Sequence, residues 1–275
     1  MKFSVLLSIY YLESPSNLTQ CLESLLQQTL RPNEIVIVKD GKLTIELDKI
    51  INYYEKEYGE LFKIIDLPEN KGLGIALQIG LNHCTYDIVA RMDTDDICVK
   101  QRFEKQIKYL EENPNVTAIG SWIGEFNKDF QVINNIRKTP VTYNEVRAKS
   151  KYRNPLNHMT VMFRKQDIQK VGNYQHFLWN EDYFLWARLL NKGYKISNLP
   201  EVLVYVRAGE SLFERRGGVK YFKQEVKLQK EFYSMGFINI FQILYNILMR
   251  LAVRILPNSM RKNVYEVFLR EKYSK

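Results

Sequence analysis

Cysteine and histidine are scarce in this sequence, and no long hydrophobic run occurs. The 275 residues include three Cys and three His. The Cys count is odd and no Cys-x-x-Cys pair is present, which argues against a disulfide framework or a cysteine zinc site and favours a reducing compartment. No stretch reaches the roughly 18 uncharged apolar residues of a membrane-spanning helix. The opening segment MKFSVLLSIYYLES has no small-residue cleavage site, so it predicts a strand and not a signal peptide.

The usual phosphate-binding motifs are missing as well. No Gly-x-Gly-x-x-Gly follows the first apolar run, and the glycines of KGLGIALQIG (71–80) have the wrong spacing. A Gly-x-x-x-x-Gly-Lys-Ser/Thr run is absent too, so the common dinucleotide-binding and P-loop sites are not predicted. No Ser-His-Asp or Cys-His arrangement has a supporting local sequence.

The composition is that of a globular protein with a basic end. Hydrophobic residues make up 45% and charged residues 26% of the chain, and the formal net charge is +9. Residues 226–275 hold nine Lys and Arg against three Glu, so two-thirds of the excess lies there. A basic, apolar tail favours an anionic membrane surface over a DNA groove, and no nucleic-acid partner is expected. The length allows one large domain, or a core domain with a smaller appendage.

Strand-like and helix-like patterns alternate through the first third of the chain. Continuous apolar runs predict strands at 3–9, 34–41, 61–67 and 86–92, and helical spacing predicts helices around 18–26, at 44–58 and at 70–84. Such alternation predicts an α/β fold with a mainly parallel sheet and right-handed crossovers. Ligands of these sheets bind at the carboxyl ends of the strands, and Asp40 and Asp93 each follow such an end.

The rest of the chain is less regular. Its patterns predict helices at 101–114 and 180–193, strands at 116–126, 158–165 and 201–209, and an irregular stretch at 127–157. A long amphipathic helix is predicted at 238–256. Its apolar face would hold Ile240, Ile243, Leu244, Ile247, Leu248, Leu251 and Ile255, and its polar side would hold Asn246, Arg250 and Arg254. Cations on that polar side are typical of a helix that lies on a membrane surface.

Three carboxylates follow the fourth strand, in the segment RMDTDDI (91–97). In an extended segment Asp93 and Asp95 point to the same side, and paired oxygen ligands favour a hard cation such as Mg²⁺ or Mn²⁺. An EF-hand is excluded, because Cys98 stands where that loop needs Gly. The alternative is a solvated turn in which the Asp side chains, Asp96 included, cap the next helix.

A second acidic pair opens a predicted helix, in the segment NED (180–182). Asn180 is a good N-cap, and acids in a first turn complement the helix dipole without any further function. The alternative is a carboxylate general base formed by Asp182 with Glu181 beside it. Trp179 would then offer an aromatic platform for the apolar face of a sugar.

Several basic side chains are candidates for phosphate binding. His158 precedes a predicted strand and is placed to reach a phosphate. The segment RAGESLFERRGG (207–218) holds Arg207, Arg215 and Arg216 before two glycines. Because Arg forms forked contacts with phosphate, this segment predicts either a lid over a diphosphate or an ordinary surface loop.

Taken in order, these segments resemble a known family. The segments are SVLLSIYY, LTQCLESLLQQTLRPNEIVIVKDG, NKGLGIALQIGL, ARMDTDD and NEDYFLWARLL. They resemble the motifs of family 2 glycosyltransferases, which are inverting enzymes of the GT-A fold. The similarity is greatest to the bacterial enzymes of capsule, exopolysaccharide and O-antigen synthesis. It implies a nucleotide-sugar-binding half at 1–97, an acceptor-binding and catalytic half at 98–225, and a basic helical tail at 226–275.

The resemblance also implies which residues bind the donor. Asp40 matches the acid that contacts the nucleotide base, although Lys39 stands where many relatives have a second acid. Lys71, Arg91 and Asp93 are the other donor-binding candidates, with Asp93 near the ribose. Asp95 matches the residue that binds the metal, which would be Mn²⁺ or Mg²⁺. Asp93 and Asp96 are further candidate ligands of the same ion.

On the acceptor side, the resemblance implies that Asp182 is the general base and that Glu181 assists it. The candidates for contact with the diphosphate or the acceptor remain His158, Trp179, Arg207, Arg215 and Arg216. The donor would be a nucleotide-diphospho-sugar, with a UDP-sugar expected, and the acceptor a glycan linked to a polyprenyl diphosphate.

The tail and the alternatives complete the expectation. Residues 237–256 are expected to hold the protein peripherally on the inner, cytoplasmic face of the cell membrane. The alternative for the tail is packing on the domain or on a second copy in a homodimer. Two other function classes stay open: a nucleotidyltransferase acting on sugar phosphates, and a non-catalytic subunit that binds nucleotide or carbohydrate. The sugar, the acceptor and the linkage cannot be read from the sequence.

Overall fold

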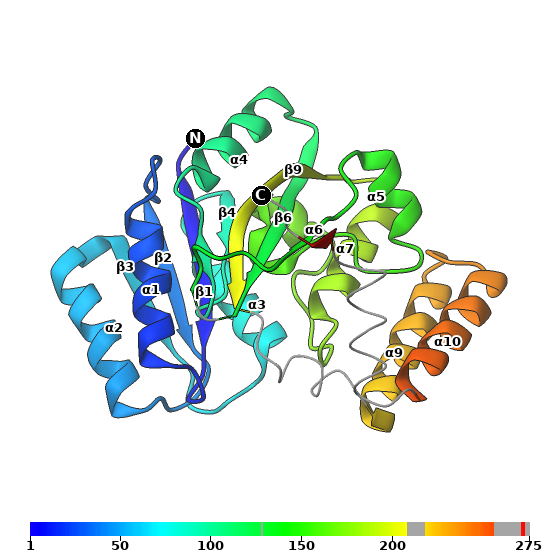
Figure 1. The fold of residues 1–275 in the computed structure, drawn as a ribbon, viewed down its shortest axis with the longest axis horizontal. Helices are drawn as coiled ribbons and strands as arrows, with labels where there is room; N and C mark the ends of the chain where they lie inside the picture. The colour runs from blue at the N-terminus through cyan, green and yellow to red at the C-terminus, as the bar shows by residue number, and fades with distance from the viewer. Residues whose placement is uncertain (128, 208–217, 256–270, 273–275) are drawn as a thin grey trace.

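The computed structural model describes residues 1–127, 129–207, 218–255 and 271–272 (Figure 1). Its strands are β1 (Phe3–Ile9), β2 (Glu34–Lys39), β3 (Phe62–Asp66), β4 (Ile88–Arg91), β5 (Ile97–Cys98), β6 (Val116–Phe126), β7 (Asn135–Arg137), β8 (Met162–Arg164), β9 (Lys195–Arg207) and β10 (Glu271–Lys272). Its helices are α1 (Pro15–Leu26), α2 (Ile45–Tyr58), α3 (Leu73–His83), α4 (Arg102–Glu112), α5 (Tyr143–Lys149), α6 (Lys165–Lys170), α7 (Glu181–Asn191), α9 (Gly218–Ser234) and α10 (Ile240–Ile255). Single 3₁₀ turns occupy Gly59–Leu61 and His158–Thr160.

One sheet runs through the molecule, in the order β10-β7-β6-β8-β4-β1-β2-β3. The strands β3, β2, β1 and β4 are parallel, and the helices α1, α2 and α3 lie between them in the chain. From β4 onward the order continues through the antiparallel strands β8, β6 and β7, while β9 runs parallel to β6 and also pairs with β5. The parallel half therefore ends its strands along one edge, where Asp40 and Asp93 follow β2 and β4.

Both faces of the parallel half are covered, which explains the continuous apolar runs in the sequence. Along β1, Val5 and Leu7 join the core under α1, α2 and α4, whereas Leu6 joins the core under α3 and α7. All three side chains have no exposed surface. The period of two along a strand thus divides one apolar run between two hydrophobic cores.

Helix α3 approaches the sheet closely at Gly80, which yields a stability prediction. A Cβ on Gly80 would lie 2.5 Å from Leu6 Cδ1 and 2.6 Å from Val38 Cγ2. Gly80→Ala is therefore expected to lower the free energy of unfolding by about 1–3 kcal/mol, in spite of the better helix propensity of Ala. Chemical denaturation measures it, with Asn52→Ala on the exposed side of α2 as the control, expected within about 0.5 kcal/mol of the parent. Equal stability of Gly80→Ala and the parent would contradict this packing.

The predicted α/β alternation of the first third of the chain is confirmed, but three later segments differ from the prediction. The stretch 127–157 is not irregular throughout, because it contains β7 and α5, and Thr142 and Glu145 form a capping box at the start of α5. The strand predicted at 158–165 is wrong at its beginning, where a 3₁₀ turn precedes the short β8. The strand predicted at 201–209 begins earlier, at Lys195. The division of the chain at residues 97 and 225 stays a prediction.

The tail contains two packed helices, α9 and α10, where the sequence predicts one (Figure 1). The polar side of α10 is turned toward the protein. Asn246 is buried at 1% exposure, and Arg250 Nε lies 3.6 Å from Glu225 Oε1 on α9. Arg250, which the sequence places on the polar side of the helix, is thus paired within the tail. Among the described residues, no helix has the length and hydropathy needed to cross a bilayer.

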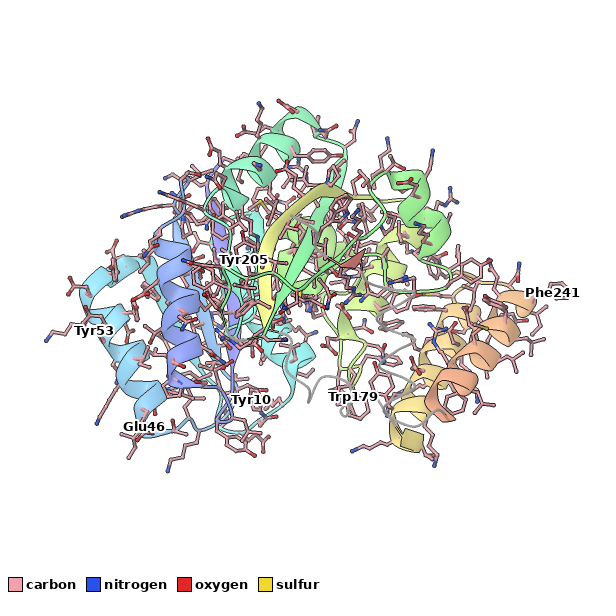
Figure 2. The ribbon with its side chains drawn as sticks, in the orientation of Figure 1. Tyr10, Glu46, Tyr53, Trp179, Tyr205 and Phe241 are labelled. Carbon is pink, nitrogen blue, oxygen red and sulfur yellow. The ribbon has the colours of Figure 1, made fainter. Side chains whose placement is uncertain are left out.

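The opposite side of α10 is apolar and exposed. Phe241, Leu244, Tyr245 and Leu248 are between 52% and 79% exposed, and Phe241 points away from the body of the molecule (Figure 2). These four residues are called the outer face of α10 below. An exposed apolar patch of this kind marks a surface that meets another apolar surface.

Candidate functional site

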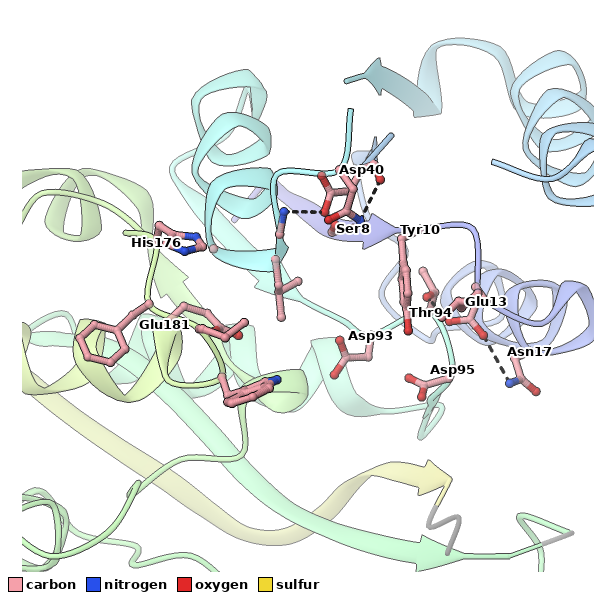
Figure 3. Close-up of a pocket in the computed structure, with 18 of the residues that line it drawn as sticks. Ser8, Tyr10, Glu13, Asn17, Asp40, Asp93, Thr94, Asp95, His176 and Glu181 are labelled. Carbon is pink, nitrogen blue, oxygen red and sulfur yellow. Dashed lines mark hydrogen bonds between the residues drawn. The ribbon is translucent and has the colours of Figure 1, made fainter. Parts of the chain in front are cut away.

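A cavity of about 610 Å³ lies at the carboxyl ends of β1, β2 and β4 (Figure 3). Its polar wall includes Ser8, Glu13, Asn17, Asp40, Asn70, Asp93, Thr94, Asp95, His176 and Glu181, and its aromatic wall Tyr10, Phe177 and Trp179. Residues from the two halves of the sequence thus face each other across one space. This is the edge at which open α/β sheets bind their ligands.

Asp40 joins the end of β2 to the start of α3. It is 4% exposed, and its two oxygens accept the backbone N–H groups of Lys71 at 2.7 Å and Gly72 at 3.0 Å. Gly41 permits the turn, since its φ is +86° and a Cβ there would lie 2.8 Å from the Asn70 nitrogen. Each oxygen of Asp40 keeps the capacity for a second hydrogen bond at the cavity wall. Lys71 contributes its backbone here, while its side chain is 42% exposed and lies 3.9 Å from Glu69.

The three carboxylates of RMDTDDI converge as predicted. One oxygen from each of Asp93, Asp95 and Asp96 lies within 4.8 Å of the others. Burial, followed by the charges of Asp93 and Glu13, raises the pKa of Asp95 to about 7. Burial, followed by the charges of Asp95 and Asp93, raises the pKa of Asp96 well above its ordinary value. A divalent cation would relieve this repulsion, and three carboxylate oxygens are the donor set that fits Mg²⁺ or Mn²⁺.

Arg91 lies beneath the cavity and not on its wall. Its side chain is 2% exposed, and its guanidinium forms an ion pair with Asp93. Arg91 is therefore placed to act on a donor through Asp93, in contrast to the direct contact that the sequence led us to expect. The buried charge also acts on the acids around it, because it lowers the pKa of Asp95, Glu181 and Asp182 against the effect of burial.

Arg207, at the end of β9, closes the other side of the carboxylate cluster. Its backbone N–H donates to Asp96 Oδ1 at 3.3 Å, and its Nε donates to the Asp95 carbonyl at 3.4 Å. Its guanidinium also lies 4.8 Å from the centre of the Phe126 ring. Arg207 thus ties β9 to the loop that carries the acids. The predicted partners Arg215 and Arg216 lie outside the described residues.

The acidic pair at the start of α7 sits across from the cluster. Glu181 lines the cavity, and burial together with Asp182 raises its pKa to about 7. Asp182 is half-buried, and burial raises its pKa, while N–H donors from Asn154 and the Tyr183 backbone act to lower it. Two carboxylates with raised pKa values beside a cavity form a candidate for proton transfer.

His158 has a different role from the one predicted. It is 9% exposed, and its Nε2 lies 2.9 Å from the Tyr174 hydroxyl. Burial, followed by the charge of Arg91, lowers the pKa of His158 well below its ordinary value. Because His158 is buried and does not line the cavity, it belongs to the buried support of the site and is not placed to reach a phosphate there.

Trp179 lies on the cavity wall with 41% of its surface exposed. Its backbone has a positive φ of 65°, and its ring stacks on Tyr221 of α9 with centroids 5.1 Å apart. Lys220 lies 5.9 Å above the same ring. The start of α9 thus supports the Trp179 ring at the cavity wall, and its use as a platform for a sugar stays a prediction.

The wall and support residues that were not predicted include Tyr10, Glu13, Asn17 and Asn154. Tyr10, Glu13 and Asn17 follow β1, so the rule that singled out Asp40 and Asp93 applies to that strand end as well. Asn154, which contacts Asp182, lies in a loop that has no recognisable motif.

Comparison with known proteins gives consistent results. A sequence model described as "Glycosyl transferase family 2" matches residues 5–172. The chain is 40% identical over 266 residues to the amylovoran biosynthesis glycosyltransferase AmsE of Erwinia amylovora, covering 96% of this chain and 98% of that protein. It is 38% identical over 269 residues to an Escherichia coli protein described as UDP-Gal:alpha-D-GlcNAc-diphosphoundecaprenol beta-1,3-galactosyltransferase, covering 98% of this chain and 97% of that one.

Solved structures share the fold at low sequence identity. S. aureus TarS residues 1–349 in complex with UDP-GlcNAc superposes with a TM-score of 0.66 at 19% identity, covering 98% of this chain and 76% of that one. A mannosyltransferase from Pyrobaculum calidifontis, in complex with GDP-Man and Mn²⁺, gives a TM-score of 0.65 at 19% identity, covering 94% of this chain and 71% of that one.

Proposed function

Because the chain belongs to the family 2 glycosyltransferases and has their GT-A fold, we propose that it transfers a sugar from a UDP-sugar to a hydroxyl of a lipid-diphosphate-linked glycan, with inversion, in bacterial surface polysaccharide synthesis. Membership of this family sets aside the nucleotidyltransferase alternative. The observation that supports the proposal most is the convergence of Asp40, Asp93, Asp95 and Glu181 on one cavity.

On the donor side, we assign the nucleotide to the wall formed by β1, β2 and β4. The free lone pairs of Asp40 would accept N–H groups of the base, and Asp93, oriented by Arg91, would accept the ribose hydroxyls. Asp93, Asp95 and Asp96 would hold Mn²⁺ or Mg²⁺, which when bound neutralises charge that develops on the leaving diphosphate. Arg207, behind this cluster, adds a fixed positive charge at the same edge.

On the acceptor side, we assign proton removal to Asp182. The acceptor hydroxyl gives its proton to the Asp182 carboxylate while its oxygen attacks the anomeric carbon from the face opposite the nucleotide. One displacement of this kind inverts the configuration. Trp179 would orient the acceptor, because an aromatic ring packs well against the apolar face of a sugar. Glu181, which lines the cavity beside Asp182, would bind a sugar hydroxyl.

The donor and acceptor classes are tested by direct assay. The Escherichia coli relative is named for UDP-Gal and a GlcNAc-diphosphoundecaprenol acceptor, so a short-chain lipid diphosphate carrying GlcNAc is the first acceptor to use. UDP-Gal, UDP-GlcNAc and UDP-Glc are compared with GDP-Man in the presence of Mn²⁺ or Mg²⁺. The proposal expects transfer from one of the UDP-sugars, and transfer from GDP-Man alone would contradict it.

We assign the outer face of α10 to the cytoplasmic surface of the cell membrane. A lipid surface fits this face better than a second copy does, because the last fifty residues also carry two-thirds of the net positive charge. Anionic lipids attract such a segment while apolar side chains enter the boundary of the acyl chains. A membrane position would also bring the cavity to the lipid-linked acceptor.

Charge placed on the outer face of α10 is expected to abolish membrane binding. Phe241→Asp combined with Leu244→Asp should reduce co-sedimentation with vesicles of phosphatidylglycerol and phosphatidylethanolamine to the level of a no-lipid sample, because burying each carboxylate in the boundary is unfavourable. Tyr53→Asp on α2, 60% exposed, is the matched control and should bind like the parent. Unchanged vesicle binding by the α10 variant, or a loss of dimer mass without a loss of vesicle binding, would contradict the membrane assignment.

A further inference from the structure

Asp182 is oriented by a side chain from a distant segment. Asn154 Nδ2 donates to Asp182 Oδ2 at 2.6 Å, and Asn154 Oδ1 accepts the Leu156 backbone N–H at 3.3 Å. The second contact determines which end of the amide faces the carboxylate. The other oxygen, Asp182 Oδ1, accepts the Tyr183 N–H at 2.7 Å. Short hydrogen bonds to an ionised carboxylate are the strong ones, so Asn154 sets the direction of this group.

The loop that carries Asn154 is itself fixed by side chains. The carbonyl groups of residues 150–152 follow the last turn of α5, where backbone acceptors lack helical partners. The hydroxyl of Tyr183 donates to the Ser150 carbonyl at 2.8 Å. From α10, Asn246 Nδ2 donates to the Lys151 carbonyl at 2.8 Å, and Arg250 Nη2 donates to the Tyr152 carbonyl at 3.0 Å.

These two α10 side chains are held in turn by α9. Asn246 Nδ2 also donates to Gln229 Oε1 at 2.7 Å, and both residues are fully or almost fully buried. Arg250 pairs with Glu225 on α9. Leaving buried polar groups of this kind without hydrogen-bond partners costs free energy, so these contacts favour one position of α10 on the loop.

Resting on the proposed function, in which Asp182 removes the acceptor proton, we propose that Asn154 is the positioning residue of the base and that α10 is part of the catalytic apparatus. Contacts run from Asn246 and Arg250 to the carbonyls of residues 151 and 152, along the backbone to Asn154, and on to the Asp182 carboxylate. The helix that presents the outer face therefore also determines where the base stands.

A pH profile separates this role from simple structural support. Besides Asn154, the groups that face Asp182 are Glu181 on α7, Arg91 on β4, Arg137 on β7 and the hydroxyls of Tyr174 and Tyr183. Burial raises the pKa of Asp182, and the N–H of Asn154 is the first of the contacts that lower it. Without this donor the pKa rises further. Because the base acts only when ionised, the acid limb of the rate profile then moves to higher pH.

The experiment compares two replacements of Asn154 in the full chain. With a short-chain lipid-diphosphate acceptor and a saturating UDP-sugar, Asn154→Ala is expected to lower kcat on the order of 10²-fold and shift the acid limb upward, with the donor KM unchanged. Asn154→Asp keeps the shape but replaces the donor with a like charge, so its loss and its shift should be larger. A structural role predicts the reverse order, because the isosteric variant would then be the milder one.

The α10 contacts are tested by Asn246→Ala and Arg250→Gln, which should shift the acid limb in the same direction with a smaller loss of kcat. Lys230→Ala, an exposed site on α9, is the control and should match the parent. Calorimetric measurement of UDP binding verifies that each variant is folded. If one of the two α10 variants does not bind UDP, the kcat and pH profile of the other variant test the proposal.

Three failures are distinguishable. If the parent transfers sugar and Asp182→Asn does not, but the Asn154 variants keep the parental kcat and pH profile, the positioning role is overturned and the proposed function stands. If the Asn154 variants lose kcat and shift the acid limb as expected, but Asn246→Ala and Arg250→Gln both keep the parental kcat and pH profile, the role of α10 alone is overturned. If the parent transfers sugar from no donor, the proposed function fails, and the positioning role fails with it.

Discussion

Replacing Asp182 by Asn is expected to reduce sugar transfer by about 10²–10⁴-fold, the range that a positioned general base contributes. The amide cannot accept the acceptor proton, yet it keeps the size of the carboxylate and its hydrogen bond from the Tyr183 N–H. The loss should therefore fall on kcat, with the KM for the UDP-sugar unchanged. Initial rates at saturating donor and acceptor measure it.

Glu181→Gln is the matched comparison for Asp182→Asn, because the two acids are adjacent and only Glu181 is on the cavity wall. If Asp182 is the base, Glu181→Gln should keep more activity than Asp182→Asn at every pH. Removing the neighbouring charge should also move the acid limb to lower pH, since the two carboxylates raise each other's proton affinity. Full activity of Asp182→Asn with an inactive Glu181→Gln would transfer the base role to Glu181.

Chelation is expected to abolish transfer, and Mn²⁺ or Mg²⁺ should restore it. The physical reason is the carboxylate cluster, whose repulsion a cation relieves and whose bound cation offsets charge on the diphosphate. Asp95→Asn should lower kcat by about 10²–10³-fold, a loss of the size seen when one preorganised electrostatic group is removed. Rates with EDTA and after return of each metal measure the effect.

Metal binding has a readout apart from activity. Mn²⁺ alone should raise the melting temperature of the parent, because a ligand that binds only the folded state stabilises it. The same addition should leave Asp95→Asn nearly unchanged, while Asp87→Asn, an acid outside the cluster, should respond like the parent. Transfer that survives chelation, or an equal rise of melting temperature in Asp95→Asn, would contradict the metal role.

The first half of the fold could be predicted because local pattern and tertiary packing agree there. The run FSVLLSI is apolar on both sides of the strand, and the sheet covers both sides. The carboxyl ends of β2 and β4 then bring Asp40 and Asp93 together by topology alone. Helix α5 is not predicted, although Thr142 and Glu145 have the spacing of a capping box, because Pro140 and Pro155 on either side of it are typical of irregular structure.

The parts of the site that the sequence does not predict depend on long-range contacts. Arg91 and His158 look like ligand contacts in the sequence, but both side chains are buried, where Arg91 pairs with Asp93 and His158 contacts Tyr174. The sequence predicts correctly that Asn246 and Arg250 share one side of α10, but it does not predict that this side faces the protein. Spacing alone does not reveal that the carbonyls of residues 151 and 152 are the partners that turn Asn246 and Arg250 inward.

The measurement that tests the central claim most directly is NMR analysis of the product made from an α-linked UDP-sugar and the lipid-diphosphate acceptor. A single displacement, with proton removal by Asp182 and departure of the diphosphate at the edge formed by Asp93 and Asp95, inverts the anomeric carbon. The proton coupling at that carbon is therefore expected to be that of a β-glycoside. A product with the α configuration of the donor would contradict the account.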